Sequence, residues 1–316
     1  MIMRLKTILI TLSVILIAAI PFVTKAYDDK GPGSVRVIRN LAYCQPANDS
    51  QSLDLYLPTK SNGPTPLIIF IHGGAWVQGD KGEAREISLL LAQYGFATAS
   101  INYRFSQQAL FPAQIEDCRA AVRWLRSHAQ EYGIDPDRFG VWGVSAGGHL
   151  ASLLGTSGDT IKDENLKVQA VCDWCGPSDL VTVASQAGSR NKLDLVTEKG
   201  PVGRLLGGPT RQKEALAKEA SPVTYINSGD PPFLIVHGDI DDLVPFAQAE
   251  EFCDKLKAAG VAVEFVRVRG AGHNLFSEEQ VRRLIDFFKQ ELPEKKNKNQ
   301  ASYLEKRITP AWLSMV

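Results

Sequence analysis

Residues 143–147 carry the first pattern that could perform chemistry. They read Gly-Val-Ser-Ala-Gly, so Ser145 has a glycine two positions away on each side. The residues before it (139–143, FGVWG) resemble a strand, and those after it (146–154) resemble a buried helix. On such a sharp strand-to-helix turn, a serine hydroxyl is pushed out above a sheet. Ser145 is therefore the predicted nucleophile, and the alternative is a structural serine in a glycine-rich turn.

A serine hydroxyl needs a neighbouring base to become nucleophilic at neutral pH. His273 lies in a loop of small residues (270–273, GAGH) that follows the last strand-like segment. A carboxylate that orients the histidine is expected after the preceding strand. The string HGDIDD offers Asp239, Asp241 and Asp242 there. The residues alone leave the choice among these three acids open.

Acyl transfer also needs hydrogen-bond donors for the negative oxygen of the tetrahedral intermediate. The string HGGAW (72–76) directly follows the apolar segment 66–71. Paired glycines let backbone amides approach a ligand closely. We therefore expect the amides of Gly74, Ala75 and Ala146 to form an oxyanion hole, and the alternative for HGGAW is a simple turn.

Strand-like and helix-like segments alternate from residue 35 to residue 292 and must position these residues. The strand-like segments are 35–40, 53–57, 66–71, 97–102, 139–143, 168–173, 233–237 and 264–268. The clearest helical segments are 113–128, 146–154, 245–259 and 277–292. Such alternation predicts an α/β fold with a mostly parallel eight-stranded sheet and helices on both faces. The first two strands read as an antiparallel hairpin.

Three other segments interrupt or flank this domain. Residues 177–231 are long and glycine-rich between two strands, which favours a cap or pocket insertion over the site. Residues 1–26 have a basic start, an apolar run and small residues before Ala26, as in a signal peptide. Residues 27–34 read as a linker and 293–316 as a polar C-terminal tail. The protein is thus predicted to be secreted or periplasmic, without stable membrane insertion after cleavage, and the alternative is an uncleaved anchor.

Composition excludes several classes of partner. Lys plus Arg and Asp plus Glu both number 35, so no strong field favours nucleic acid. The histidines and cysteines do not have zinc-ligand spacing, and no cofactor or metal is expected. Cys172 and Cys175 form a CxxC that ends a strand instead of opening a helix. This position favours packing or a local disulfide over redox chemistry.

The ordered motifs resemble a known branch of enzymes. HGGAW, FPAQIEDCRAAVRWLR, GVSAGGHLASLLG, CGPSDL, PPFLIVHGDIDDLVP and RGAGH are similar to exported α/β-hydrolases that include bifunctional feruloyl and acetyl xylan esterases. The similarity runs from about residue 35 to residue 292, and the CDWC string departs from it. The resemblance implies the α/β-hydrolase fold with a small cap insertion. It also assigns the acid to the second Asp of HGDxD, which is Asp241, in the chain order Ser145, Asp241, His273.

The predicted function is that of a serine esterase working through an acyl-enzyme. Its substrates would be small-molecule or polysaccharide esters, with acetyl or feruloyl esters of plant polysaccharide implied by the resemblance. One alternative is an amide hydrolase, because HGGxW also resembles kynurenine formamidases and the C-terminal motifs resemble prolyl-oligopeptidases. Another is an inactive binding module on the same fold, which the complete set of candidate residues disfavours.

Overall fold

The computed structural model describes residues 35–61, 63–189 and 191–293. The predicted signal peptide (1–26), the predicted linker (27–34) and all but the first residue of the predicted tail (293–316) lie outside these ranges. None of the helices formed by the described residues is long and apolar enough to cross a membrane.

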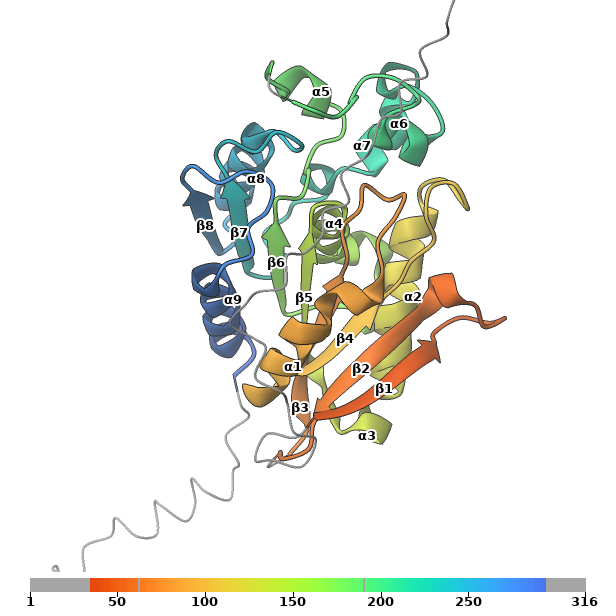
Figure 1. The fold of residues 1–316 in the computed structure, drawn as a ribbon, viewed down its shortest axis with the longest axis vertical. Helices are drawn as coiled ribbons and strands as arrows, with labels where there is room; N and C mark the ends of the chain where they lie inside the picture. The colour runs from red at the N-terminus through yellow and green to blue at the C-terminus, as the bar shows by residue number, and fades with distance from the viewer. Residues whose placement is uncertain (1–34, 62, 190, 294–316) are drawn as a thin grey trace, which may run out of the picture.

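An eight-stranded sheet runs through the molecule (Figure 1), with the spatial order β1-β2-β4-β3-β5-β6-β7-β8. Strand β2 is antiparallel to β1 and β4, and every other neighbouring pair is parallel. The mostly parallel sheet and the antiparallel hairpin are therefore confirmed. The strands are β1 (Val35–Ala42), β2 (Ser52–Pro58), β3 (Thr65–Ile71), β4 (Ala97–Ile101), β5 (Ile134–Val144), β6 (Ala170–Trp174), β7 (Phe233–Gly238) and β8 (Val263–Val268).

Helices cover both faces of the sheet because its central strands are apolar on both sides. Along β3, Leu67 and Ile69 face one hydrophobic cluster, whereas Ile68 and Phe70 face the other. Helices α2, α4 and α8 contribute to the first cluster, and α1 and α9 contribute to the second (Figure 1). The long helices are α1 (Arg85–Gln93), α2 (Ala113–Ser127), α4 (Ala146–Ile161), α8 (Phe246–Ala258) and α9 (Glu278–Glu291), and a short α3 (Ala129–Tyr132) follows α2.

Some boundaries differ from the predicted ones. Helix α4 continues to Ile161 although its second half contains Thr156, Ser157 and Gly158. The hydroxyls of Thr156 and Ser157 donate to the carbonyls four residues earlier, at 3.0 and 2.5 Å, so these polar groups are satisfied inside the helix. The sequence pattern did not single out α1, whose nine residues span only about two and a half turns.

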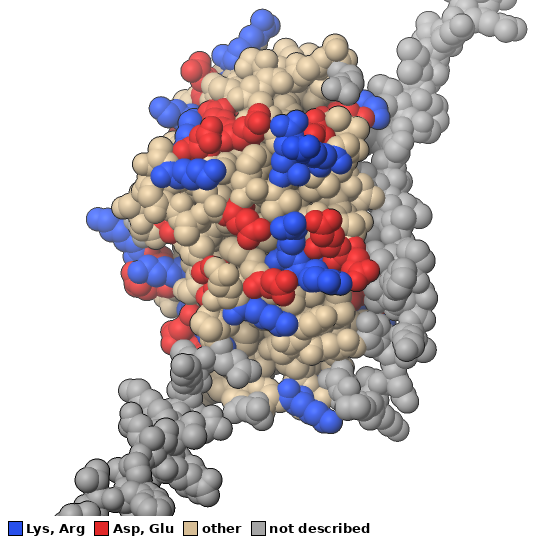
Figure 2. Space-filling view, turned by 90° about the vertical axis from the view of Figure 1, so that its left-hand side faces the viewer, with Lys and Arg blue, Asp and Glu red and all other residues tan. Residues whose placement is uncertain are grey.

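The cap predicted at residues 177–231 lies beyond the carboxyl ends of the strands, over β5 and β6 (Figure 1). It consists of short pieces joined by irregular chain. These are α5 (Val183–Gln186), α6 (Pro201–Leu206), α7 (Glu214–Glu219) and the 3-10 turns η4 (Thr210–Gln212) and η5 (Pro222–Thr224). Further 3-10 turns are η1 (Asp49–Gln51), η2 (Lys81–Ala84) and η3 (Glu164–Leu166). On the face in Figure 2, basic and acidic side chains are interspersed, with no large area of one sign.

Candidate active site

Every predicted site residue lies at the carboxyl edge of the parallel strands. The oxyanion-loop residues follow β3, Ser145 follows β5, Asp241 follows β7 and His273 follows β8. Parallel strands end at the same edge, so residues far apart in sequence meet there. This edge is also the one that faces the cap (Figure 1).

Ser145 occupies a strained turn between β5 and α4. Its φ and ψ are 58° and −121°, a conformation that few non-glycine residues adopt. A Cβ at Gly143 would lie 2.1 Å from the carbonyl oxygen of Gly147. A Cβ at Gly147 would lie 2.0 Å from the carbonyl oxygen of Ile71. Both glycines are therefore required sterically, as the GxSxG pattern predicted.

His273 and Asp241 form a hydrogen-bonded pair. The distance between His273 Nδ1 and Asp241 Oδ2 is 2.7 Å, and the carboxylate is fully buried. Asp239 instead accepts hydrogen bonds from Arg267 and from the amide of Gly270. Asp242 forms an ion pair with Lys192. Of the three candidate acids, Asp241 is thus the one that contacts the histidine.

Four donors surround the carboxylate of Asp241. Oδ1 accepts from the amides of Leu243 and Val244, at 2.8 and 3.0 Å. Oδ2 contacts His273 and also His237 Nε2, at 3.2 Å. Burial raises the pKa of Asp241, but the hydrogen bonds from His237 and His273 outweigh it and hold that pKa well below its usual value. Asp241 therefore stays ionised beside the imidazole.

Ser145 and His273 are not directly hydrogen-bonded to each other in the described residues. Nucleophile–base contacts of this kind are often long until a substrate is bound. His273 Nε2 lies 4.0 Å from Cys175 Sγ. The Cys175 thiol also donates to the His273 carbonyl, at 3.5 Å. Both Cys172 and Cys175 are buried and unlinked, which agrees with packing and not with a local disulfide.

The oxyanion loop has an unusual backbone. Gly74, Ala75 and Trp76 have φ values of 102°, 55° and 58°. The loop passes close to the nucleophile, since a Cβ at Gly73 would lie 3.4 Å from the Cβ of Ser145. No hydrogen bond joins the amides of Gly74, Ala75 or Ala146 to another described residue. These amides are consequently available as donors beside Ser145.

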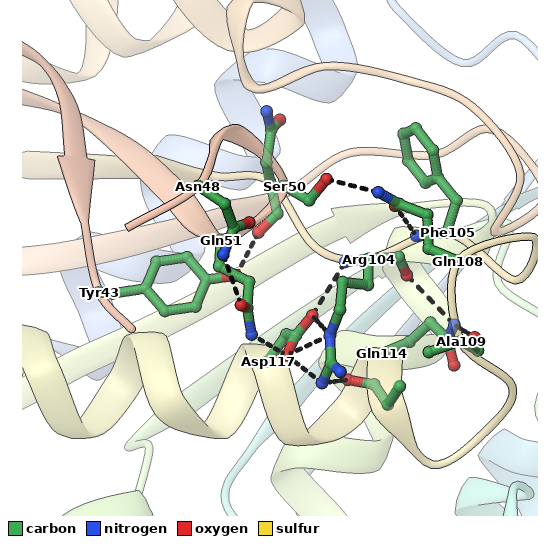
Figure 3. A network of polar contacts seen from close by, with 12 residues as sticks. Tyr43, Asn48, Ser50, Gln51, Arg104, Phe105, Gln108, Ala109, Gln114 and Asp117 are labelled. Carbon is green, nitrogen blue, oxygen red and sulfur yellow. Dashed lines mark hydrogen bonds and ion pairs between the residues drawn. The ribbon is translucent and has the colours of Figure 1, made fainter. Parts of the chain in front are cut away.

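The segment that follows β4 supports this loop. The hydroxyl of Tyr103 donates to the His72 carbonyl at 3.1 Å, and the amide of Ser106 donates to the Trp76 carbonyl at 2.8 Å. Arg104, between them, forms a bidentate contact with the buried carboxylate of Asp117 on α2 (Figure 3). The ion pair thereby holds the supporting segment against the domain.

His149 is a buried residue that no motif in the sequence marked as part of the site. Its Nδ1 accepts a hydrogen bond from Trp76 Nε1 at 3.2 Å, and its Nε2 donates to the Ala220 carbonyl at 2.6 Å. Burial lowers the pKa of His149 to about 4, so the ring is neutral. It links the nucleophile helix, the oxyanion loop and the cap. Its position four residues after Ser145, one helical turn away, was the available signal in the sequence.

A small apolar pocket opens beside Ser145. Its volume is about 30 Å³. The pocket is bordered by the oxyanion loop, the elbow, the cap and the loop after Asp241. The lining residues are Ala75, Trp76, Ser145, Ala146, Pro177, Val183, Leu193, Leu195, Pro201, Val202, Leu243 and Val244. His273 is absent from this lining, so the base lies to one side of the pocket.

Within the described residues, one group of side chains has metal-ligand chemistry: Cys175, Asp241 and His273. Their potential ligand atoms lie within 4.8 Å of one another. However, His273 Nδ1 and both oxygens of Asp241 already form the hydrogen bonds described above. The arrangement suits an acid–base pair better than a bound ion.

Solved structures of other proteins are similar to this chain. A truncated carbohydrate esterase from gut microbiota is 33% identical, with a TM-score of 0.72, over 82% of this chain and 97% of that one. A bifunctional GH43-CE protein of Bacteroides eggerthii is 32% identical, with a TM-score of 0.74, over 84% of this chain and 39% of that one. The α/β-hydrolase fold is thereby confirmed.

Curated relatives are similar over part of their length. The probable carboxylic ester hydrolase LipM of Mycobacterium tuberculosis is 36% identical over 62% of this chain and 46% of its own. The chain spans about half the length of the curated relatives it matches. The family model described as BD-FAE matches residues 53–256 of the 316. The chain therefore belongs to the BD-FAE family of α/β-hydrolases.

Proposed function

We propose that the protein is a serine esterase that cleaves esters of short, apolar acyl groups, acetyl esters above all. The observation that carries this proposal is the hydrogen bond between His273 and Asp241 at the same sheet edge as the strained Ser145. Unpaired amides beside that serine complete what acyl transfer requires. The names of the relatives, which are ester hydrolases and carbohydrate esterases, point the same way.

In the proposed mechanism, Ser145 Oγ attacks the ester carbonyl and its proton passes to His273 Nε2. Asp241 keeps the Nδ1–H tautomer of His273 in place and stabilises the imidazolium. The amides of Gly74, Ala75 and Ala146 donate to the developing oxyanion. His273 then protonates the leaving alcohol, and the acyl group stays on Ser145. Water, deprotonated by His273, attacks the acyl-enzyme and releases the acid.

The pocket beside Ser145 supports a short acyl group. The leaving alcohol must lie against His273, which protonates it, so a pocket without His273 is suited to the acyl side. A small pocket with an apolar lining suits a short acyl group better than a feruloyl ring. Of the two acyl groups predicted from the sequence, the pocket thus favours acetyl. A carbohydrate alcohol is proposed from the family and from the similarity to solved structures of a carbohydrate esterase and of a bifunctional GH43-CE protein.

The mechanism is tested with Ser145→Ala. We expect turnover of p-nitrophenyl acetate to fall by about 10⁴-fold or more, because the nucleophile is lost. A fluorophosphonate probe should label the wild type and fail to label the variant. Ser185→Ala, at an exposed serine in the cap, should change neither result. Unchanged turnover or labelling in Ser145→Ala would refute the proposed nucleophile.

The acyl preference is tested with a series of nitrophenyl esters. We expect kcat/KM to fall from acetate to butyrate to octanoate, and methyl ferulate to be a poor substrate, because the pocket is small. Acetylated xylan and acetylated glucose should distinguish a carbohydrate alcohol from a generic one. An acetyl anilide tests the amide-hydrolase alternative. Octanoate or ferulate turned over as fast as acetate would contradict the assignment of the pocket.

A further inference from the structure

His237 is a buried histidine next to the acid–base pair, and the mechanism above gives it no step. It lies near the end of β7, four residues before Asp241, and its side chain is fully buried. Its Nε2 lies 3.2 Å from Asp241 Oδ2 and 3.1 Å from the Val244 carbonyl oxygen. Its Nδ1 has no hydrogen-bond partner among the described residues. Among the described residues, the ring is therefore hydrogen-bonded at Nε2 alone, and this edge faces Asp241.

These contacts determine the tautomer. A carbonyl oxygen can only accept a hydrogen bond, and Asp241 is ionised and accepts as well. Nε2 of His237 must then carry the hydrogen, which is shared between the two oxygens. A hydrogen on Nδ1 would leave a buried donor unpaired, at a cost of about 1–3 kcal/mol. The geometry thus describes a neutral ring that donates from Nε2.

The Nε2–H of His237 completes the set of hydrogen-bond donors that fixes the plane of the Asp241 carboxylate. The amides of Leu243 and Val244 hold Oδ1, and without His237 only His273 itself would hold Oδ2. During catalysis the proton moves at His273 Nε2 while Nδ1–H stays on Oδ2, so a second donor on Oδ2 holds the carboxylate independently of the residue that it has to orient. The second acid near His237, Asp173 on β6, is bound by the Ser152 hydroxyl and the Gly176 amide. Asp241 is thereby left as the carboxylate partner of His237.

We propose that His237 is a positioning residue that acts through Asp241: its Nε2–H holds Oδ2 so that the carboxylate keeps His273 aligned with Ser145. The proposal rests on the serine-esterase function proposed above. His237 does not line the pocket beside Ser145. Its removal should consequently lower kcat and leave KM almost unchanged.

Two amide substitutions that differ in reach test the proposal. His237→Gln can place an N–H where Nε2 lies, whereas the shorter side chain in His237→Asn cannot reach Asp241. We expect kcat to fall by about 10–100-fold in His237→Asn, a size typical for lost supporting hydrogen bonds at a reactive group. In His237→Gln, kcat should stay within about fivefold of the wild type. KM should remain within about twofold in both. His128→Asn, at a histidine on the end of α2, is the matched control and should leave kcat unchanged.

A double-mutant cycle separates positioning from a general structural effect. Asp241→Asn alone should lower kcat about 10⁴-fold. If His237 acts through Asp241, adding His237→Asn to Asp241→Asn should cost less than about threefold more. If His237→Asn lowered kcat by as large a factor in the Asp241→Asn variant as in the wild type, the proposal would be overturned. Equal kcat values for His237→Gln and His237→Asn would overturn it as well. A loss of kcat/KM in His237→Asn that came from a higher KM and not from a lower kcat would also overturn it.

The wild-type protein offers a test that needs no variant and no activity. In ¹⁵N-histidine NMR spectra, His237 should appear as the neutral Nε2–H tautomer. A hydrogen on Nδ1 would overturn the proposal even if every variant folded poorly. Since this spectrum does not depend on ester turnover, failure of the serine-esterase function, seen as an active Ser145→Ala, remains distinguishable from failure of the role of His237.

Discussion

The nucleophile elbow and the cap face each other across the pocket, but they are held in different ways. The elbow is fixed by backbone sterics, since Gly143 and Gly147 admit no Cβ and Ser145 donates its amide to the Trp174 carbonyl at 2.7 Å. Where the cap passes the acid loop, it is held by one backbone hydrogen bond, from the Lys192 amide to the Asp242 carbonyl at 2.7 Å, and otherwise by side chains. Asn191 Nδ2 donates to the Leu243 carbonyl at 3.0 Å, and the exposed Lys192 pairs with Asp242.

Because of this difference, we expect the elbow to serve the chemical step and the cap to serve selectivity for the acyl group. Reacting groups must be placed to within a fraction of an ångström, which backbone constraints achieve. Selectivity for the acyl group needs only an apolar surface at the right distance, which Leu193 and Leu195 of the cap supply. We therefore expect substitutions in the elbow to affect all substrates and substitutions in the cap to affect some of them.

The largest effect is expected from Gly147→Ala. Its Cβ would lie 2.0 Å from the Ile71 carbonyl oxygen and 2.6 Å from that of His72, so the elbow or the oxyanion loop must shift. We expect kcat/KM for every ester to fall by about 10²-fold or more. Gly158→Ala, in the same helix with no atom within 4 Å of the new Cβ, should keep full activity. Equal activities of the two variants would show that backbone sterics do not hold the elbow.

An effect of intermediate size is expected from pH, which should change the free energy of unfolding through two buried histidines beside the elbow and the oxyanion loop. Burial lowers the pKa of His72 and of His149 to about 4, whereas in the unfolded chain both take up protons below about 6.5. The unfolded state therefore binds more protons between these values, and the free energy of unfolding should fall as the pH decreases. The loss is about 2 kcal/mol per histidine at pH 5. Asp241, whose pKa is lowered, adds to the loss only below about pH 4.

Urea unfolding at pH 7.5 and pH 5 measures this effect. His149→Gln should remove about half of the histidine contribution, since it removes one of the two groups. The same pH dependence in the variant and the wild type would mean that His149 is not buried as a neutral ring.

A smaller and selective effect is expected in the cap from Leu195→Ala. The substitution enlarges the pocket, so the ratio of kcat/KM for butyrate to that for acetate should rise by about 10-fold. Val196→Ala, at the neighbouring residue, which is 61% exposed, is the matched control and should leave the ratio unchanged. A rise in both variants, or in neither, would remove Leu195 as a determinant of acyl length.

The smallest effect is expected from Lys192→Ala. The side chain is 70% exposed, and exposed ion pairs contribute about 0–1 kcal/mol. Thermal unfolding should change by a few degrees at most, and kcat/KM for acetate by less than about threefold. A large loss of activity would show that this single contact holds the cap, and the contrast with the elbow would have to be reversed.

Local patterns in the sequence were enough to predict several strands and most of the candidate site residues. The apolar run 66–71 predicted a strand buried on both faces, and the Gly-x-Ser-x-Gly string predicted the turn at Ser145, because both depend on interactions of nearby residues. The order of the oxyanion loop, the elbow, the acid and the base along the chain could be predicted for the same reason, since a local motif marks each of them. Choosing among the three acids required a family resemblance, since Asp239, Asp241 and Asp242 have the same chemistry and almost the same position.

Only the tertiary structure decided which side chains meet. Asp241 alone of the three acids points to His273, His237 supplies a second donor to it, and His149 joins the elbow to the cap. The size of the acyl pocket was likewise beyond prediction, because its walls come from four segments far apart in sequence. Contacts of this kind depend on where the strands end and how the cap folds back, which no local pattern encodes.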